Sequence, residues 1–233
     1  MTLEVITIDG PAAVGKTTVG RRVAQRLGWT FFDTGVLYRA LTWLAQQHGL
    51  LIDNAGELAG LASTLDVRVQ APTVADGRDA DIMLDGTDVT WAIRSPEVNR
   101  DVSPVAALPA VREALVAPQR NAARAGRAVV VGRDIGTVIF PDAALKVFLQ
   151  APAEERARRR GAELAVRGVR RAAADVLQEL RARDTLDAQR ADAPLVAAAD
   201  AVRLDTEGLT VEEVADRIVG LWSARRGHEQ PGG

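Results

Sequence analysis

Gly10-Pro-Ala-Ala-Val-Gly15-Lys16-Thr17 comes just after the apolar run Leu3–Ile8, and these two segments decide the fold. They match G-x-x-x-x-G-K-[ST], the pattern of a phosphate-binding loop, placed as expected after a buried strand. The glycines let backbone N–H groups and the start of the next helix converge on phosphate oxygens. Lys16 adds a charge and Thr17 a hydroxyl for Mg²⁺. The sequence therefore predicts a site for nucleotide phosphates.

Lysine is rare in this chain. Lys16 and Lys146 are the only lysines among 29 Lys and Arg residues, so a lysine at the required position argues against a chance match. We expect the Lys16 ammonium to be exposed in the loop, where it contributes to a reaction rather than to the core.

Composition excludes several classes of protein. A net charge of −2 and a pI near 5.8 argue against a nucleic-acid binder. The absence of cysteine excludes disulfides, thiolate catalysis and cysteine-based zinc sites. No run of about 18 apolar residues occurs, so no membrane span is expected. The chain starts without a basic segment, and we expect a soluble cytoplasmic enzyme with one sizeable core, or with one core and small appended modules.

Apolar runs alternate with helical patterns along the chain. We expect strands at Leu3–Ile8, Thr30–Phe32, Ala128–Val131, Leu145–Leu149 and Ala201–Leu204. Helices are expected at Lys16–Leu27, at Val36–Gln47 and, after the capping box Thr210–Glu213, as far as about Arg225, with a frayed tail at His228–Gly233. This alternation predicts an α/β protein with a parallel sheet.

Three stretches depart from this alternation. A small antiparallel sheet in a separate lobe is predicted by three short segments. These are Leu65–Val69, Ile82–Leu84 and Thr87–Trp91, with Asp85-Gly86 joining the last two. The segment Pro152–Arg171 is rich in charged residues. From charge alone, a solvated helical hairpin is as good an interpretation of this segment as a functional one. Ala110–Ala125 has a helical pattern that Pro118 should kink or divide.

Residues at the ends of the other strands indicate the reaction class. A guanine-nucleotide switch needs N/T-K-x-D, which the chain lacks. Asp33, Thr34 and Arg39 follow the second strand, and Arg133 and Asp134 follow the third. Ligands bind beyond the carboxyl ends of parallel strands, so these residues should converge with the phosphate loop on one crevice. Two arginines there suit a second, phosphorylated substrate.

At this point the chain resembles the bacterial cytidylate kinases, the (d)CMP kinases of the nucleoside monophosphate kinase family. The matching segments run through nearly the whole chain in order: Gly10–Thr18, Asp33–Arg39, Val102–Ala107, Val111–Leu115, Gly132–Ala143 and Arg183–Arg190. The blocks G-R-D-I-G-T and R-D-x-x-D-x-x-R are far more specific than the phosphate loop. Departures are small, among them Thr34 in place of a common serine.

The resemblance implies a P-loop fold in three parts. These are a core with a five-stranded parallel sheet, a monophosphate-binding lobe enlarged by the antiparallel insert, and a short helical lid. The expected boundaries are core at 1–62, 99–151 and 173–233, insert at 63–98 and lid at 152–172. The family is usually monomeric, and we expect a monomer.

The resemblance also implies the reaction ATP + (d)CMP ⇌ ADP + (d)CDP, without a covalent intermediate. ATP would lie on the loop formed by Gly10, Pro11, Ala12, Ala13, Val14, Gly15, Lys16, Thr17 and Thr18, with Mg²⁺ at Thr17. Thr34, Arg39 and Arg133, beside Asp33, would hold the CMP phosphate. Arg156 and Arg159 in the lid would cover the transferring phosphoryl group.

Recognition of the base follows from its polar edge. Cytosine offers a donor at N4 and acceptors at N3 and O2, so Asp134 and Ser103 suit the first and Arg112 suits the second. Ser103 could instead cap a helix at Val105–Leu108. By the resemblance, Arg183 and Asp187 bind the pentose hydroxyls, and Arg190 should share their helical face. Alternatively, Asp187 only orients Arg183.

Two other functions are compatible with the phosphate loop. An adenylate or shikimate kinase shares it but does not explain Ser103, Arg112 and Asp134 beside a large antiparallel insert. A catalytically idle nucleotide-binding module would have lost residues that bind the phosphoryl acceptor, and none of these residues is lost here.

Overall fold

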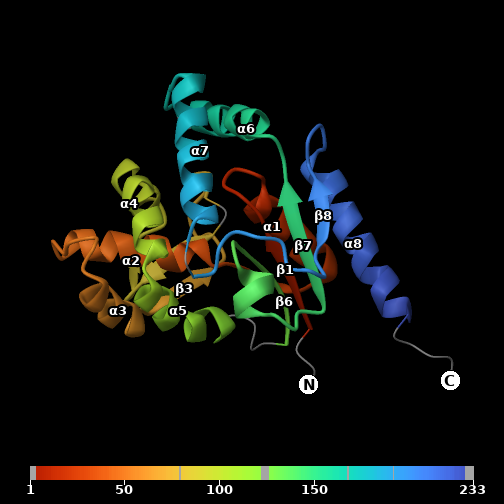
Figure 1. The fold of residues 1–233 in the computed structure, drawn as a ribbon, viewed down its shortest axis with the longest axis horizontal. Helices are drawn as coiled ribbons and strands as arrows, with labels where there is room; N and C mark the ends of the chain where they lie inside the picture. The colour runs from red at the N-terminus through yellow and green to blue at the C-terminus, as the bar shows by residue number, and fades with distance from the viewer. Residues whose placement is uncertain (1–3, 79, 122–125, 167, 191, 229–233) are drawn as a thin grey trace. The chain divides into compact units, whose positions relative to one another are not determined.

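The apolar run before the phosphate loop forms the central strand of a parallel sheet. β1 (Glu4–Asp9) lies between β6 (Arg127–Gly132) and β7 (Leu145–Gln150). β2 (Thr30–Asp33) and β8 (Val202–Asp205) complete the order β2-β6-β1-β7-β8, with every neighbouring pair parallel (Figure 1). The central strands are almost continuously apolar because both faces of the sheet are covered. The predicted five-stranded parallel sheet is confirmed.

The computed structural model describes residues 4–78, 80–121, 126–166, 168–190 and 192–228. The chain forms two compact units, of which the first combines Met1–Asp33 with Ala122–Gly233 and the second is Thr34–Asn121. The first unit carries the parallel sheet. The finer division into core, insert and lid stays a prediction. Leu3, Ala122–Ala125 and the tail after His228 lie outside the described residues.

Two helices of the first unit pack on each other and on the sheet. α1 (Lys16–Leu27) begins at the phosphate loop and has the predicted bounds. α8 (Val211–His228) begins with the predicted capping box, because the Thr210 N–H donates to Glu213 Oε2 at 2.8 Å and the Glu213 N–H donates to Thr210 Oγ1 at 3.2 Å. α8 extends three residues beyond the predicted end at Arg225. The apolar faces of both helices pack against the strands through Val19, Val23, Val214 and Ile218.

A helical hairpin follows β7. α6 (Ala153–Val166) and α7 (Ala173–Ala188) pack against each other beyond the carboxyl end of β7 (Figure 1). Ala157, Val176 and Leu180 bury a small apolar cluster together with Ala12 of the phosphate loop. The hairpin is therefore packed on the loop by apolar contacts, and its second helix begins at Ala173, directly after the predicted end of the lid at residue 172.

The second unit contains helices that pack in pairs. These are α2 (Gly35–Gln47), α3 (Ala55–Ser63), α4 (Pro96–Ala107) and α5 (Pro109–Asn121), and the packed pairs are α2 with α4, α3 with α5 and α4 with α5. Pro118 does not divide α5, which runs on to Asn121. A proline inside a helix removes one backbone donor, and this helix tolerates that loss.

The predicted antiparallel sheet is also present in the second unit. β3 (Val67–Gln70), β4 (Asp81–Leu84) and β5 (Thr87–Asp88) lie in that order, and both pairs are antiparallel. Asp85 and Gly86 both have positive φ, 48° and 80°, as an Asp-Gly hairpin turn requires.

β5 ends earlier than the sequence pattern suggests. The predicted strand continued to Trp91, whereas β5 stops at Asp88. Beyond it, Thr90 Oγ1 accepts the Ile82 N–H at 2.8 Å in place of a backbone partner. The chain then enters the short 3₁₀ helix η1 (Ala92–Arg94).

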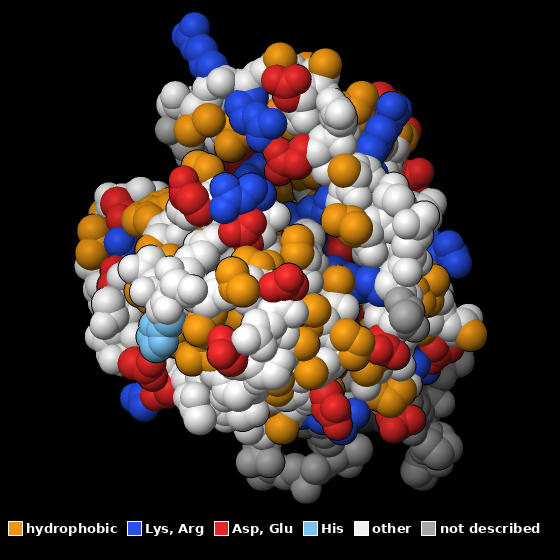
Figure 2. Space-filling model, turned by 60° about the vertical axis from the view of Figure 1, so that its left-hand side comes forward, with side chains coloured by type: hydrophobic (Ala, Val, Ile, Leu, Met, Phe, Trp, Pro, Cys, Tyr) orange, Lys and Arg blue, Asp and Glu red, His pale blue; other side chains and the backbone are white. Residues whose placement is uncertain are grey.

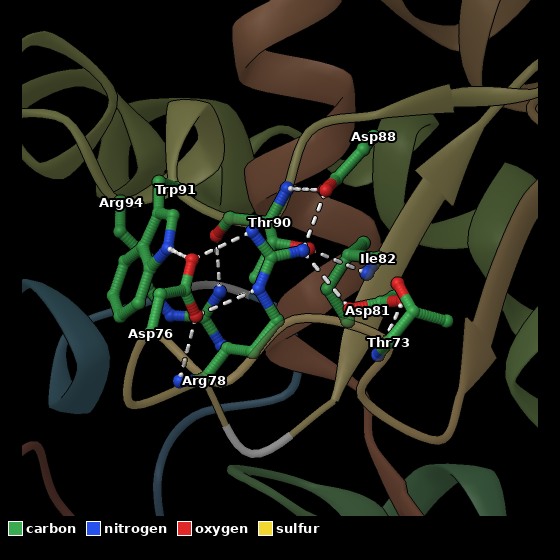
Figure 3. A network of polar contacts seen from close by, with 9 residues as sticks. All are labelled: Thr73, Asp76, Arg78, Asp81, Ile82, Asp88, Thr90, Trp91 and Arg94. Carbon is green, nitrogen blue, oxygen red and sulfur yellow. Dashed lines mark hydrogen bonds and ion pairs between the residues drawn. The ribbon is translucent and has the colours of Figure 1, made fainter.

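A network around Arg78 holds the loop between β3 and β4 (Figure 3). The Arg78 guanidinium, whose side chain is only 7% exposed, pairs with Asp76, Asp81 and Asp88. Trp91 Nε1 also donates to Asp76 Oδ2 at 2.8 Å. One arginine thereby connects the loop, β4 and β5, and a role in the stability of the antiparallel sheet accounts for these contacts.

Charge and hydropathy of the described residues add two observations. On the face displayed in Figure 2, Lys and Arg side chains are interspersed with Asp and Glu rather than separated by sign. Among the helices that the structure describes, none combines the length and apolar character needed to cross a membrane.

Candidate active site

The phosphate loop has a backbone that only particular residues can adopt. Gly10 has φ 151°, and a Cβ at this position would lie 2.4 Å from the Leu149 carbonyl oxygen of β7. Gly15 has φ 99° and caps the start of α1. Ala13 also has positive φ, 58°, which is strained for a residue with a side chain. Such strain is typical of functional loops.

Lys16 lies inside the curl of the loop. Its ammonium donates to the carbonyl oxygens of Gly10 and Pro11, both at 2.7 Å, and the residue is only 7% exposed. The prediction of an exposed ammonium is therefore wrong, because the loop wraps around the side chain. Burial and the nearby Arg133 guanidinium lower the pKa of Lys16, while the Asp33 carboxylate opposes them. A bound phosphate would offset the effects of burial and of Arg133, because its negative charge favours the charged form of Lys16.

Thr17 and Asp33 bring two oxygen groups together. The Thr17 hydroxyl donates to Asp33 Oδ2 at 2.6 Å, which links the start of α1 to the end of β2. Hydroxyl and carboxylate oxygens are the ligands that Mg²⁺ prefers. Thr18 is exposed on the first turn of α1.

A buried carboxylate lies between two arginines. Arg133 Nε donates to Asp187 Oδ2 at 2.8 Å, and the Arg190 guanidinium pairs with Asp187 Oδ1. Asp187 is 1% exposed. Although burial raises it, Arg133 and Arg190 hold the pKa of Asp187 below its usual value, with a further contribution from Arg183. The arrangement fixes two guanidinium groups at the ends of β6 and α7.

The position of Arg190 differs from the prediction. Arg190 was expected on one helical face with Arg183, but α7 ends at Ala188 and Gln189 caps it. Arg190 reaches Asp187 from the segment after the helix. Residue spacing alone does not reveal where a helix ends, so the helical argument failed, and the contact of Arg190 with Asp187 was not predicted.

Two arginines of α6 contact the phosphate loop. Arg156 donates to the Ala12 carbonyl oxygen at 3.1 Å and pairs with Asp184 of α7 at 2.6 Å. Arg159 donates to the Val14 carbonyl oxygen of the loop at 3.4 Å and to Thr206 Oγ1 at 2.9 Å. Arg156 is buried. The open alternative of a solvated hairpin is thus wrong at these positions, because their charges are turned inward.

In the second unit, Thr34 and Arg39 lie on α2. Thr34 occupies the cap position at the start of this helix and is buried. Arg39 Nη1 donates to Asn99 Oδ1 at 2.7 Å and to the Ile93 carbonyl oxygen at 3.2 Å. Asn99 thus holds the guanidinium group from α4.

Ser103 and Arg112 lie on α4 and α5 of the same unit. Ser103 is buried inside α4, so the alternative that it caps a helix at Val105–Leu108 is wrong. Arg112 is buried as well, with Nη1 donating to the Ala106 carbonyl oxygen at 3.1 Å and the guanidinium 5.8 Å from the Tyr38 ring centroid. These contacts fix the direction of the Arg112 side chain.

The structure gathers the predicted residues into one group per unit. The first unit brings together Lys16, Thr17, Asp33, Arg133, Asp187 and Arg190. Asp134 belongs to this unit and is buried. The second unit carries Thr34, Arg39, Ser103 and Arg112 on helices that pack together. Convergence of both groups on one crevice stays a prediction.

Sequence reasoning missed three side chains that hold this machinery. Asp184 pairs with Arg156, and Asn99 holds Arg39. Asp9 accepts two backbone N–H groups just after Asp134. Asp184 is the first aspartate of the R-D-x-x-D-x-x-R block, but the block was given no role for it, and Asp9, directly before Gly10, belongs to none of the quoted motifs.

The fold and these contacts define a class of protein. The phosphate loop lies between the central strand of a parallel sheet and a helix. It is accompanied by a buried lysine, a Thr–Asp oxygen pair and two arginines on either side of Asp187. This is the arrangement of a P-loop phosphotransferase.

Comparison with known proteins identifies the family. The family described as cytidylate kinase matches residues 6–224. Cytidylate kinases from Herpetosiphon aurantiacus and Azotobacter vinelandii are 49% and 50% identical, over 93% and 95% of this chain and 93% and 96% of their own. A bifunctional pantoate ligase/cytidylate kinase from Synechococcus elongatus is 47% identical over 95% of this chain, which spans only 42% of that longer protein. The chain belongs to the cytidylate kinase family.

Proposed function

We propose that this chain transfers the γ-phosphoryl group of ATP to CMP and dCMP. An oxygen of the CMP phosphate attacks the γ-phosphorus, and the bond from that phosphorus to the β,γ-bridging oxygen breaks, giving ADP and CDP or dCDP. The observation that carries the proposal is the Arg133–Asp187–Arg190 cluster beside Lys16, because a loop for ATP alone needs no second arginine site. Family membership supports ATP and CMP as the substrates.

ATP would bind on residues 10–18. Backbone N–H groups and the start of α1 would hold its phosphates, and Lys16 would exchange its carbonyl partners for the β- and γ-phosphate oxygens. Thr17 and Asp33 fit Mg²⁺, directly or through water. The described residues contain no cluster of three metal-ligating side chains, so most of the ion's ligands would be phosphate oxygens and water. Mg²⁺ would neutralise charge on the transferring group.

The CMP phosphate would lie against Thr34, Arg39 and Arg133. Guanidinium groups suit this role because they contact phosphate oxygens in bidentate fashion. Asn99 and Asp187 orient the two arginines before substrate arrives. After binding, Arg156 and Arg159 would need to leave part of their present contacts to reach the phosphoryl group.

Cytosine would be read by three buried groups. Ser103 and Asp134 would accept from N4, and Arg112 would donate to N3 and O2. Arg183, Asp187 and Arg190 would face the pentose. We further expect the protein to act as a cytoplasmic monomer, without nucleic-acid or membrane partners.

A coupled assay of ADP release tests the function. CMP and dCMP should support turnover, with UMP slower and with AMP and shikimate inactive. Preference for AMP or shikimate would identify another P-loop kinase. If none of these acceptors leads to ADP release, the chain would be a catalytically idle nucleotide-binding module.

The base site gives a specific prediction. Replacing Arg112 with methionine should raise KM for CMP and narrow the ratio of kcat/KM for CMP over UMP by about tenfold, because the donors for N3 and O2 are removed. Exposed Arg120 on the same helix offers a matched control, and its methionine variant should keep the wild-type ratio. Asp134→Asn should also narrow the ratio. An unchanged ratio in Arg112→Met would mean that the base is read elsewhere.

The sugar site gives a second prediction, which concerns the effect of replacing Asp187 on CMP and on dCMP. The sequence favoured Asp187 as the acceptor for the 2′-OH, so that its loss would affect CMP more than dCMP. Both carboxylate oxygens already accept from arginines. We therefore expect Asp187→Asn to lower kcat/KM for CMP and dCMP by similar factors, about tenfold or more, because it releases Arg133 and Arg190. A loss confined to CMP would restore the 2′-OH assignment.

A further inference from the structure

Asp9 is a buried carboxylate that the mechanism above does not use. It is the last residue of β1, directly before Gly10, and is 5% exposed. Its Oδ1 accepts the Ile135 N–H at 2.9 Å and its Oδ2 accepts the Gly136 N–H at 2.8 Å. These donors follow immediately after Arg133 and Asp134. One side chain therefore joins the start of the phosphate loop to the segment that carries two proposed CMP contacts.

The segment that Asp9 holds is a single helical turn. η2 (Ile135–Ile139) is a π-helical turn, in which the Phe140 N–H donates to the Ile135 carbonyl oxygen at 2.7 Å. The first N–H groups of a helix have no acceptor within it. Asp9 supplies that acceptor from the neighbouring strand, so it fixes where the turn begins and how residues 133 and 134 leave β6.

Gly136 shows how closely this turn lies on the sheet. A Cβ at Gly136 would lie 2.9 Å from Thr7 Oγ1, 3.2 Å from Lys146 Cδ and 3.3 Å from Asp9 Oδ2. The backbone thus rests directly on β1 and β7. The Thr7 hydroxyl, two residues before Asp9 on the same face of β1, is buried and makes no hydrogen bond. Of these neighbours on β1, only Asp9 bonds the turn.

Burial disfavours the ionised form of Asp9. Burial raises the pKa of Asp9 to about 6, opposed by the two backbone N–H groups, with Asp134 raising it further and Lys16 lowering it. A carboxyl whose pKa is raised on folding stabilises the protein at low pH, and that contribution is lost as pH rises from 3.8 to about 6. At neutral pH the charge on Asp9 is therefore unfavourable, and the hydrogen bonds from the Ile135 and Gly136 N–H groups offset part of that cost.

We propose that Asp9 is a positioning residue, which sets Arg133 and Asp134 relative to the phosphate loop by fixing the Ile135 and Gly136 N–H groups. The proposal rests on the proposed function for its kinetic consequence, and on the backbone contacts alone for its structural one. It assigns to Asp9 an effect on the CMP side of the reaction, although Asp9 adjoins the ATP loop in sequence.

The test compares Asp9→Asn with Thr7→Val. Asparagine keeps the shape of Asp9 but turns an NH₂ group toward one of the two N–H donors, whereas Thr7→Val removes a hydroxyl that has no partner. Asp9→Asn should raise KM for CMP about tenfold and leave KM for ATP within about twofold, because one buried donor loses its acceptor. Thr7→Val should resemble the wild type in both constants.

Amide hydrogen exchange gives a readout that does not depend on activity. The Ile135 and Gly136 amides should exchange slowly in the wild type and in Thr7→Val, and at least one should exchange at least tenfold faster in Asp9→Asn. Unchanged exchange, or a loss in Asp9→Asn that falls on ATP instead of CMP, would overturn the proposal. If Asp9→Asn fails to fold, Gly136→Ala displaces the same N–H group and should also raise KM for CMP. A wild type that does not phosphorylate CMP would refute the proposed function, and the exchange data would still decide the role of Asp9.

Discussion

Replacing Lys16 with methionine will lower kcat for CMP phosphorylation by about two to three orders of magnitude, the loss seen when a preorganised group is removed from charge developing in a transition state. Methionine keeps most of the side-chain volume and removes only the charge. The Lys16 ammonium lies buried against two loop carbonyls, where burial lowers its pKa, so its removal should not reduce thermal stability. Steady-state kinetics and a melting curve measure the two effects.

Lys146 provides the matched control. It is the other lysine of the chain and is also buried, but its Nζ donates to Asp200 Oδ1 at 2.9 Å, far in sequence from the loop. Lys146→Met keeps most of the side-chain volume beside Gly136 and should leave kcat within about threefold of the wild type. Equal losses in both variants, or near-wild-type turnover in Lys16→Met, would contradict the role given to Lys16.

The second large effect is expected at Arg133. Arg133→Met should lower kcat/KM for CMP by about 10²–10³, because it removes a guanidinium from the acceptor phosphate as charge develops. Asp187 keeps Arg190 as a partner, so the buried carboxylate is not left unpaired. Arg133→Lys should recover only part of the loss, since an ammonium cannot bind two phosphate oxygens in the same geometry.

Arg158 serves as the control for Arg133. Its side chain is 70% exposed and pairs with Glu155 on the surface of α6. Exposed ion pairs of this kind contribute little. Arg158→Met should therefore leave kcat/KM unchanged. A similar loss in Arg158→Met would mean that arginine removal acts through the net charge of the protein, and full recovery by Arg133→Lys would exclude bidentate binding.

Much of this architecture could be predicted because its signals are local. The strand before Gly10, the helix that begins at Lys16 and the capping box at Thr210 each depend on a few adjacent residues, and all three are present. The Asp85-Gly86 turn likewise requires only backbone conformations that its residues adopt readily.

What could not be predicted depends on contacts between distant segments. Arg156 lies in a charged stretch that suggests a solvated surface, yet Asp184 turns it inward. Arg190 lies beyond the end of α7 and still reaches Asp187, which helical spacing did not predict. The burial of Lys16 follows from the loop that encloses it, which residue type does not reveal. Asp9 has partners more than a hundred residues away, and a lone aspartate carries no pattern that would point to them.

The most direct test of the central claim follows the phosphoryl group itself. Purified protein incubated with ATP labelled in its γ-phosphate and with an equal mixture of CMP, UMP and AMP should place most of the label in CDP within the first turnovers. Label that stays in ATP, that is released as inorganic phosphate, or that enters ADP or UDP ahead of CDP would contradict the assignment of this chain as a CMP kinase.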